Sequence, residues 1–302
     1  NTIQGDGSTV NDRVGRGRTG QTGGQAGGRA VGLEAVKEYE VLLAPYDVRQ
    51  GNFTGALINA VTKNGTNEFR GSAFYYFRNQ DFSGDPLGLT KFSQHQFGAS
   101  LGGPVQRDKA HFFANAEFRR RSTPARGPYL GQPASLGTVR ATQAQIDALN
   151  AALTSYGLPA SGAGGLITNT NPLNNLLARV DYEVSGRSRL VFRYIYNTAQ
   201  DDIFSRGATG TYDLSTVGYK FNSRTHNPSI QFFTHFPSGA SNEVLFSLNR
   251  IRDKRDPNVV APLIIVQNFP AADGSAPYSL QSGAERFSQG NELDQDIWEL
   301  TD

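Results

Sequence analysis

The chain has 302 residues, a formal net charge of +2, a mean hydropathy of −0.45 and no cysteine. The lack of cysteine excludes disulfides, thiolate chemistry and cysteine-ligated metal sites, and the near-neutral charge provides no bulk attraction to nucleic acid. No segment approaches the roughly 18 consecutive apolar residues that a membrane-spanning helix needs. Helical membrane proteins are therefore excluded, whereas membrane strands that alternate apolar and polar residues are not.

The first 66 residues predict a loop followed by a few short elements. Residues 1–32 are polar and rich in glycine, which is typical of a loop. Leu33–Tyr39 predicts a short helical stretch, and Tyr39–Leu43 predicts a strand. A second strand is expected over Ala56–Lys63, because the turn signal Asn64-Gly65 follows it directly.

From Glu68 onward the sequence shows segments in which apolar and polar residues alternate. The alternation predicts strands over Phe69–Arg78, Gln96–Val105, His111–Arg121, Asn175–Val184, Arg189–Asn197, Ser229–Phe236, Asn242–Ile251, and one that starts near Glu292. In His111–Arg121, Phe113 is an exception, because it falls on the polar face.

The connections between these strands alternate in length. Short turns are expected at Gln106–Lys109, Ser185–Ser188 and Pro237–Ser241, and long loops over Ser122–Leu173, Thr198–Asn227 and Arg252–Asn291. An outer-membrane β-barrel has this pattern, with short turns on one rim and long extracellular loops on the other. Such a sheet has to close on itself, since lipid offers no hydrogen-bond partners to a free edge.

One helix is expected inside the first long loop, over Gln143–Tyr156. Thr142 and Gln145 have the spacing of a capping box, and Gly157 follows at the position of a C-terminal cap. The apolar side chains of the predicted helix share one face, and they are Ile146, Leu149 and Leu153. We expect this short helix to pack on a loop.

Two motifs, one typical of dinucleotide binding and one of a catalytic nucleophile, occur without the structural context that they require. Gly15–Gly20 matches G-x-G-x-x-G, but no strand precedes it and no helix follows it. Gly98–Gly102 matches G-x-S-x-G, but it lies within a predicted strand instead of a strand-to-helix turn. The four histidines show no ligand spacing. We therefore expect no enzyme, no cofactor and no metal site.

Four blocks of the sequence, in order, resemble the TonB-dependent outer-membrane receptors, and most of all their Oar-like subfamily. These blocks are Leu33–Asn79, Gln96–Arg121, Asn174–Asn197 and Phe287–Asp302. The resemblance implies an all-β membrane protein, in which part of a large antiparallel transmembrane β-barrel of about 22 strands encloses an α+β plug. Residues 1–66 would be the C-terminal part of that plug, and residues 67–302 the first seven to eight barrel strands with long extracellular loops.

The resemblance also implies a location in the cell outer membrane and a function in transport. The implied partners are outer-membrane lipid, a TonB-type energy-transducing protein and a ligand that the sequence does not identify. Because the chain begins without methionine and stops inside a predicted strand, we expect a piece of a longer protein, without the segment that contacts the energy-transducing protein.

Two other functions stay open at this point. An outer-membrane structural or export-linked Oar-like protein would have the same barrel without nutrient uptake. A soluble β-rich binding module would lack the outward apolar band, about 25 Å tall, of a membrane barrel.

Charged residues on the polar faces of the predicted strands are the candidate site residues. A charge that faces lipid near the bilayer centre costs about 2–4 kcal/mol for arginine, so these side chains are expected to face the barrel lumen. We interpret them as partners of the plug in ion pairs, since buried charges need partners, and a polar path for a substrate is the alternative. The candidates are Glu117, Arg119, Arg179, Asp181, Glu183 and Arg193.

Overall fold

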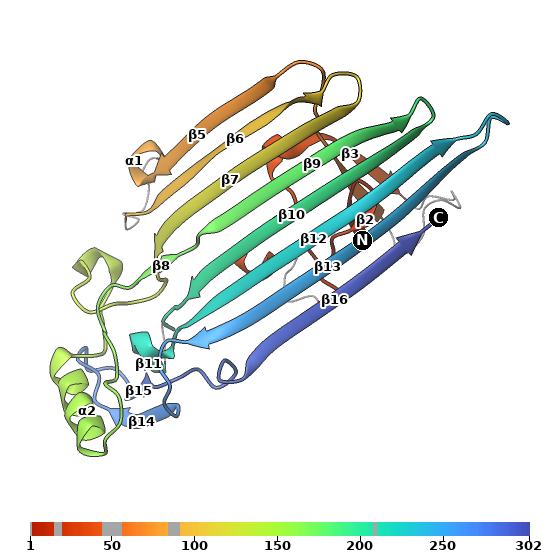
Figure 1. Ribbon diagram of the computed structural model, residues 1–302. Helices are drawn as coiled ribbons and strands as arrows, with labels where there is room; N and C mark the ends of the chain where they lie inside the picture. The colour runs from red at the N-terminus through yellow and green to blue at the C-terminus, as the bar shows by residue number, and fades with distance from the viewer. Residues whose placement is uncertain (1, 15–19, 44–55, 84–90, 208–209) are drawn as a thin grey trace.

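The computed structural model describes residues 2–14, 20–43, 56–83, 91–207 and 210–302, and its dominant feature is one large antiparallel sheet, here called the main sheet. Its long strands lie side by side in the order β16-β13-β12-β10-β9-β7-β6-β5, as Figure 1 shows. The short strand β8 (Thr168–Thr170) pairs with β7 in addition. Each neighbouring pair in the order is antiparallel, as in an outer-membrane barrel wall.

The long strands coincide with the eight segments that the alternation predicts. They are β5 (Arg70–Asn79), β6 (Ser93–Gln106), β7 (Ala110–Pro124), β9 (Leu173–Ser185), β10 (Ser188–Ile203), β12 (Tyr219–His235), β13 (Ser241–Pro257) and β16 (Asn291–Thr301). The three predicted short turns are confirmed, because each lies between the end of one of these strands and the start of the next.

The two faces of the main sheet differ as alternation requires. On β9 and β10, Val180, Tyr182 and Phe192 are 38–42% exposed, whereas Asp181 and Arg193 are 5% and 1% exposed. Successive side chains of a strand point to opposite faces, so the sheet has an outer apolar face and an inner polar face.

Two of the predicted long loops are too long. Strand β10 continues to Ile203, β12 begins as early as Tyr219, and β13 continues to Pro257. In these extensions, polar side chains lie on both faces of the strand, so the apolar–polar alternation disappears from the sequence while the backbone pairing persists. The prediction of loop for these stretches is wrong for that reason.

Residues 2–14, 20–43 and 56–66 form a separate N-terminal unit that packs on the inner face of the main sheet (Figure 1). Its four-stranded sheet has the order β2-β1-β4-β3. The strands are β1 (Thr2–Gly5), β2 (Ser8–Thr9), β3 (Val36–Leu43) and β4 (Ala56–Thr62), and β1 runs parallel to β4. A short 3-10 helix covers Gly24–Ala26.

Two predictions for this unit are wrong. The expected loop over 1–32 contains β1 and β2, which are too short to show alternation and which depend on pairing with the distant β4. The expected helical stretch Leu33–Tyr39 is a single 3-10 turn over Leu33–Ala35, after which β3 begins at Val36. The β-branched Val36 and the pairing of β3 with β4 favour a strand there.

The apolar core between the N-terminal unit and the main sheet explains the exception at Phe113. Phe113 points to the inner face, where it is 5% exposed and belongs to one buried cluster with Leu177 and Ile195 of the main sheet. The N-terminal unit contributes Val10, Ala30, Val31, Ala35, Val36 and Ala60 to that cluster. A large apolar side chain on the polar face is therefore part of the contact with the N-terminal unit.

The long connections fold into a third part, here called the loop unit, at one end of the main sheet (Figure 1). It contains α2 (Gln143–Ser155), 3-10 helices over Ala134–Leu136 and Ser215–Val217, and a sheet of β11 (Thr211–Asp213), β15 (Tyr278–Ser282) and β14 (Ile264–Phe269). Helix α1 (Gln80–Ser83) follows β5 separately.

Helix α2 confirms the predicted capping box, because the Thr142 hydroxyl and the Gln145 side chain bond each other's backbone N–H groups. We expected the apolar face of α2 to pack on a loop, but it packs on the small sheet of the loop unit as well. Ile146, Leu149 and Leu153 share a buried cluster with residues of β11 and β15 and their surroundings, namely Tyr212, Leu214, Tyr278 and Leu280. Within the described ranges, no helix has the length and apolarity needed to cross a membrane.

Candidate functional site

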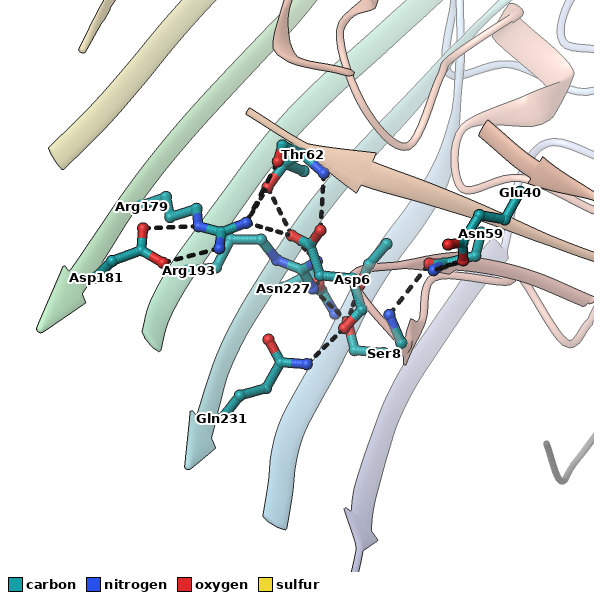
Figure 2. A network of polar contacts seen from close by, with 12 residues as sticks. Asp6, Ser8, Glu40, Asn59, Thr62, Arg179, Asp181, Arg193, Asn227 and Gln231 are labelled. Carbon is teal, nitrogen blue, oxygen red and sulfur yellow. Dashed lines mark hydrogen bonds and ion pairs between the residues drawn. The ribbon is translucent and has the colours of Figure 1, made fainter. Parts of the chain in front are cut away.

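The candidate site is the polar interface between the N-terminal unit and the inner face of the main sheet, and its centre is the turn between β1 and β2. Asp6 and Gly7 form this turn with φ angles of 44° and 79°, and Gly5 pairs with Ser8 across it. Two consecutive positive φ angles in a two-residue hairpin are typical of a type I′ turn, which Asp-Gly favours. The turn directs the Asp6 carboxylate toward β9 and β10, as Figure 2 shows.

The Asp6 carboxylate joins both units through a set of short contacts. Oδ2 accepts a hydrogen bond from Nη1 of Arg193 at 3.0 Å and lies 3.6 Å from Nη1 of Arg179. The backbone N–H and the hydroxyl of Thr62, at the end of β4, donate to the same carboxylate at 2.7 and 2.6 Å. One carboxylate thus connects β1–β2, β4, β9 and β10.

Both guanidiniums have further partners. Arg179 donates two parallel hydrogen bonds to Asp181 at 2.9 and 2.8 Å and a third to the Thr62 hydroxyl at 3.0 Å. Arg193 donates to the Ser8 hydroxyl and, at 3.1 Å, to the side-chain oxygen of Asn227 on β12. Asp6, Thr62, Arg179, Asp181 and Arg193 are here called the Asp6 cluster. Its two positive and two negative charges balance, as buried charges require.

The electrostatics of the Asp6 cluster favour the ionised carboxylate. Burial alone would raise the pKa of Asp6, but the charges of Arg193 and Arg179 and the hydrogen bonds from Thr62 outweigh it. The pKa of Asp6 therefore lies below its ordinary value near 3.8. The ion pairs persist throughout the neutral pH range.

The surroundings of the turn leave little freedom for Asp6 to move. Gln231 of β12 donates to the Asp6 backbone oxygen at 2.8 Å, and the Gly7 N–H donates to the Asn59 side chain at 3.1 Å. A Cβ atom on Gly5 would lie only 3.1 Å from Nη1 of Arg193, so glycine allows a close approach of the two units there.

A second group of contacts joins β2 and the residues after it to β13 and β16. The Glu299 carboxylate accepts hydrogen bonds from the Thr9 N–H at 2.9 Å and from the Thr9 hydroxyl at 3.1 Å. Gln295 donates to Asp12 at 2.8 Å, and Asn249 donates to the backbone oxygen of Asn11 at 3.2 Å.

A third group lies nearer the loop unit. The Glu117 carboxylate accepts hydrogen bonds from the Leu33 N–H at 3.0 Å and from Gln96 at 2.8 Å. Arg119 donates to Asn171 at 2.6 Å, and Asn171 in turn donates to the backbone oxygen of Ala26 at 2.9 Å. Glu117 therefore contacts the N-terminal unit directly, and Arg119 does so through one intermediate side chain.

The six candidates from the sequence thus occupy different places. Arg179, Asp181 and Arg193 meet in the Asp6 cluster, while Glu117 and Arg119 belong to the group nearer the loop unit. Glu183 is exposed near the turn after β9 and takes no part in these side-chain contacts.

Most of the residues that the sequence analysis missed lie in the expected loop over 1–32 or carry no charge, and Glu299 is the exception. The missed residues are Asp6, Ser8, Thr9, Thr62, Asn227, Gln231 and Glu299. The Asp6-Gly7 dipeptide was an available signal, because it is among the strongest short-range signs of a hairpin.

The motifs set aside in the sequence provide no rival site. Most of Gly15–Gly20 falls outside the residues that the structure describes. Gly98–Gly102 lies in the extended strand β6, without a nucleophile elbow. Across residues 2–14, 20–43, 56–83, 91–207 and 210–302, no cluster of three or more histidine, aspartate or glutamate side chains is arranged to hold a metal ion.

Comparison with known proteins identifies relatives in both sequence and fold. The family "Outer membrane beta barrel domain" matches residues 61–134. The TonB-dependent transporter Oar of Myxococcus xanthus is 37% identical over 93 residues, which cover 27% of this chain and 9% of that protein.

Two solved structures match nearly the whole chain in fold. The outer membrane transporter YddB from Escherichia coli has a TM-score of 0.61 at 12% identity and covers 98% of this chain. A mutant of the ferric enterobactin receptor PfeA from Pseudomonas aeruginosa has a TM-score of 0.55 at 15% identity and covers 99%. The chain spans only 36% and 37% of these two structures.

The relatives are transporters and receptors, not enzymes, and the matched domain is an outer-membrane barrel. The chain is therefore a homologue of the TonB-dependent transporter Oar that carries an outer-membrane β-barrel domain in the fold of TonB-dependent receptors, and it lies in the cell outer membrane.

Proposed function

We propose that residues 1–66 are the C-terminal part of a plug, that residues 67–302 are the first strands of the barrel around it, and that the protein imports a ligand through this plugged barrel. A TonB-type energy-transducing protein would supply the work. The observation that carries the proposal is the contact of Asp6, from the N-terminal unit, with Arg193 and Arg179 on the inner face of the main sheet.

The Asp6 cluster supports a plug that stays closed at rest. Removing one partner of a buried ion pair costs about 3–5 kcal/mol, because the other charge is left buried and unpaired. Separation of Asp6 from the sheet would leave Arg193, which is 1% exposed, without a carboxylate at hydrogen-bond distance. Thermal motion alone would therefore rarely open this contact, and an external source of work is required.

The main-sheet residues of the Asp6 cluster allow the contact with Asp6 to open and close reversibly. When Asp6 leaves, Arg179 keeps its two hydrogen bonds to Asp181, and Arg193 keeps its bond to Asn227. These partners belong to the main sheet itself, so they would hold both guanidiniums in place for the return of the plug. The carboxylate that leaves carries the Thr62 hydrogen bonds with it, since Thr62 belongs to the N-terminal unit.

A single cysteine tests the proposed movement, because this chain has no cysteine. Ser8 is 0% exposed, and its replacement by cysteine changes one atom. In cells, Ser8→Cys should react with a small maleimide only when the TonB-type protein is present and energised. The matched control is Ser185→Cys, at the exposed end of β9, which should react equally in both conditions.

Two results would contradict the proposal. Equal labelling of Ser8→Cys in cells with and without the TonB-type protein would show that no energised movement reaches β2. Rapid labelling in both kinds of cell would show that the N-terminal unit does not close the inner face.

A further inference from the structure

Part of the inner face of the main sheet remains accessible beside the N-terminal unit. This part lies on β5, β6 and β7, at the end of these strands where the long connections leave the sheet (Figure 1). It consists of two neighbouring rows of register partners. The rows are Tyr76, Gln96 and Arg119, and Arg78, Gln94 and Arg121, and these six residues are here called the inner patch.

The inner patch points to the same side of the sheet as the N-terminal unit. On β5, the hydroxyl of Ser72 donates a hydrogen bond to Glu34 of that unit at 3.3 Å, and Tyr76 lies on the same face because side chains of a strand alternate. On β6, Gln96 donates to Glu117, which itself contacts the N-terminal unit. A ligand on the inner side of the sheet would therefore meet these side chains.

The guanidinium groups of the inner patch have unused donors. Arg121 is exposed, and in the described part of the chain its side chain takes part in no hydrogen bond or ion pair. Arg78 is exposed as well, and its Nε donates to the Ser83 hydroxyl at 3.2 Å. Arg119 donates from Nη2 to Asn171, while its buried Nε lacks a partner within the described residues. All three arginines can thus donate further hydrogen bonds.

Positive charge exceeds negative charge at the inner patch, which holds three arginines and no acidic residue. Arg29 of the N-terminal unit and Arg121 both repel Arg119. Asp201 and Glu117 attract it, but each of them acts more weakly than either arginine does. The Glu117 carboxylate is 4% exposed and already accepts two hydrogen bonds. With these neighbours included, four guanidinium groups face two carboxylates, so the inner patch is suited to an anionic ligand.

The inner patch also presents an aromatic ring and two amides. Tyr76 is 63% exposed, and its ring lies 5.3 Å from the ring of Phe74 on the same face of β5. Phe74 in turn lies against Gly98, where a Cβ atom would be only 2.8 Å from the ring. Glycine at this position therefore lets Phe74 support Tyr76 from below. Gln94 and Gln96 place amide groups between the arginines of β5 and β7.

The spacing of these groups favours an extended ligand. Neighbouring strands lie about 4.8 Å apart, and two residues along one strand cover about 7 Å. The backbones of Arg78 and Arg121 are thus separated by about 10 Å, and those of Arg119 and Arg121 by about 7 Å. A chain-like ligand with a charge on each unit can contact all three guanidinium groups and the Tyr76 ring at once.

We propose that the inner patch binds an acidic oligosaccharide, a short chain of sugar rings that carry carboxylate groups. Arginine binds a carboxylate through two parallel hydrogen bonds, which the three arginines of the patch can supply. The Tyr76 ring would stack on the apolar face of one sugar, and the two glutamine amides would bind sugar hydroxyl groups. The inference rests on the proposed import of a ligand and names the chemical class of that ligand.

Equilibrium binding to the protein in a non-ionic detergent tests the proposal. The probes are trigalacturonate, the uncharged trisaccharide maltotriose, and citrate as a small anion. We expect trigalacturonate to bind at least about tenfold more tightly than either of the others. Arg78→Gln and Arg121→Gln should each weaken its binding about tenfold, as expected for one charge-assisted hydrogen bond. Tyr76→Ala should weaken binding severalfold, whereas Tyr76→Phe, which keeps the ring, should retain it.

The control variant is Arg187→Gln, which removes an exposed arginine in the turn between β9 and β10, at the opposite rim of the sheet. Trigalacturonate should bind this variant as it binds the wild type. Because Arg78 and Arg121 are exposed, their variants should keep the melting temperature of the wild type, which verifies that they fold.

Several results would overturn the proposal. Equal binding of maltotriose would show that the carboxylates are not recognised, and equal binding of citrate would show that the sugar rings are not. Absence of trigalacturonate binding, or unchanged binding in both Arg78→Gln and Arg121→Gln, would reject the inner patch as its site. Equilibrium binding needs no energy source, so these results leave the labelling of Ser8→Cys as the separate test of import. Intact trigalacturonate binding without energised labelling would reject the import and keep the binding site.

Discussion

The carboxylate of Asp6 accepts a 3.0 Å hydrogen bond from Arg193, a residue 187 positions later in the sequence. Asp6 belongs to a turn of the N-terminal unit, and Arg193 lies near the middle of β10 in the main sheet. The Arg193 side chain is 1% exposed, so its charge has to be compensated inside the protein. Each unit therefore supplies a charge that the other one needs.

Replacing Asp6 tests how much its contact with Arg193 stabilises the N-terminal unit. Asp6→Asn keeps the shape of the side chain but removes the charge opposite Arg193 and Arg179, so we expect the N-terminal unit to lose about 3–5 kcal/mol of stability. The measurement is urea unfolding followed by hydrogen exchange of the β1 and β4 amides. The control is Glu68→Gln, whose ion pair with Arg70 has both side chains over 70% exposed. That change should cost under about 1 kcal/mol. Equal effects of both variants would contradict the buried pair.

The lowered pKa of Asp6 predicts a dependence on pH with a definite sign. A carboxyl whose pKa is lower in the folded state contributes stability that is complete above its unfolded value and is lost as the pH falls through its folded value. The β1–β2 amides should thus stay protected at pH 7 and lose protection below the ordinary carboxyl value near 3.8. The comparison is the same acid titration with Asp6→Asn. An identical acid transition in that variant would assign the effect to other carboxylates.

The loop unit depends on one buried arginine, Arg206, which the sequence analysis did not single out. Its guanidinium donates to the backbone oxygens of Asp213, Gly165 and Ala163 at 2.7, 2.9 and 3.0 Å, and so joins two of the long connections. Arg206→Met should speed hydrogen exchange in β11 and β15 severalfold, because three carbonyl groups lose their donor. Exchange in β1 should not change, and faster exchange there would show that the loop unit and the N-terminal unit are coupled.

Two neighbouring residues of β9 test which face of the sheet meets lipid. Tyr182 is 38% exposed on the outer face, and Glu183 is exposed on the opposite face. Spin labels attached at Tyr182→Cys and Glu183→Cys in a bilayer should differ, since oxygen concentrates in lipid and a nickel chelate stays in water. We expect the label at 182 to respond to oxygen and the label at 183 to the nickel chelate. The opposite order would reverse the assignment of inner and outer faces.

Local patterns in the sequence were sufficient to predict the main sheet and the ends of α2. The alternation in Asn175–Asn197 separates Val180 from Arg179 and Asp181, and it depends only on the two-residue period of a strand. The capping residues Thr142 and Gln145 act within one turn of helix, so their role is equally visible in the sequence.

The partners of the charged residues were not predictable in this way. Arg193 meets Asp6 across 187 positions, and Thr9 meets Glu299 across 290. These contacts arise only when the N-terminal unit packs on the sheet, and no local period encodes them. The strand extensions up to Ile203 and Pro257 were missed for another reason, because their outward side chains lie above the apolar band and are themselves polar.

The Asp6 cluster holds the N-terminal unit on the inner face of the main sheet, and a double-mutant cycle tests this role most directly. The free energy of opening of the β1–β2 amides would be measured by hydrogen exchange in the wild type, in Asp6→Asn, in Arg193→Gln and in the double variant. If the two side chains form a buried pair, the double variant should be more stable than the sum of the single effects predicts, by more than about 1 kcal/mol. Effects that add to within about 0.5 kcal/mol would show that Asp6 and Arg193 do not interact, and would contradict the account.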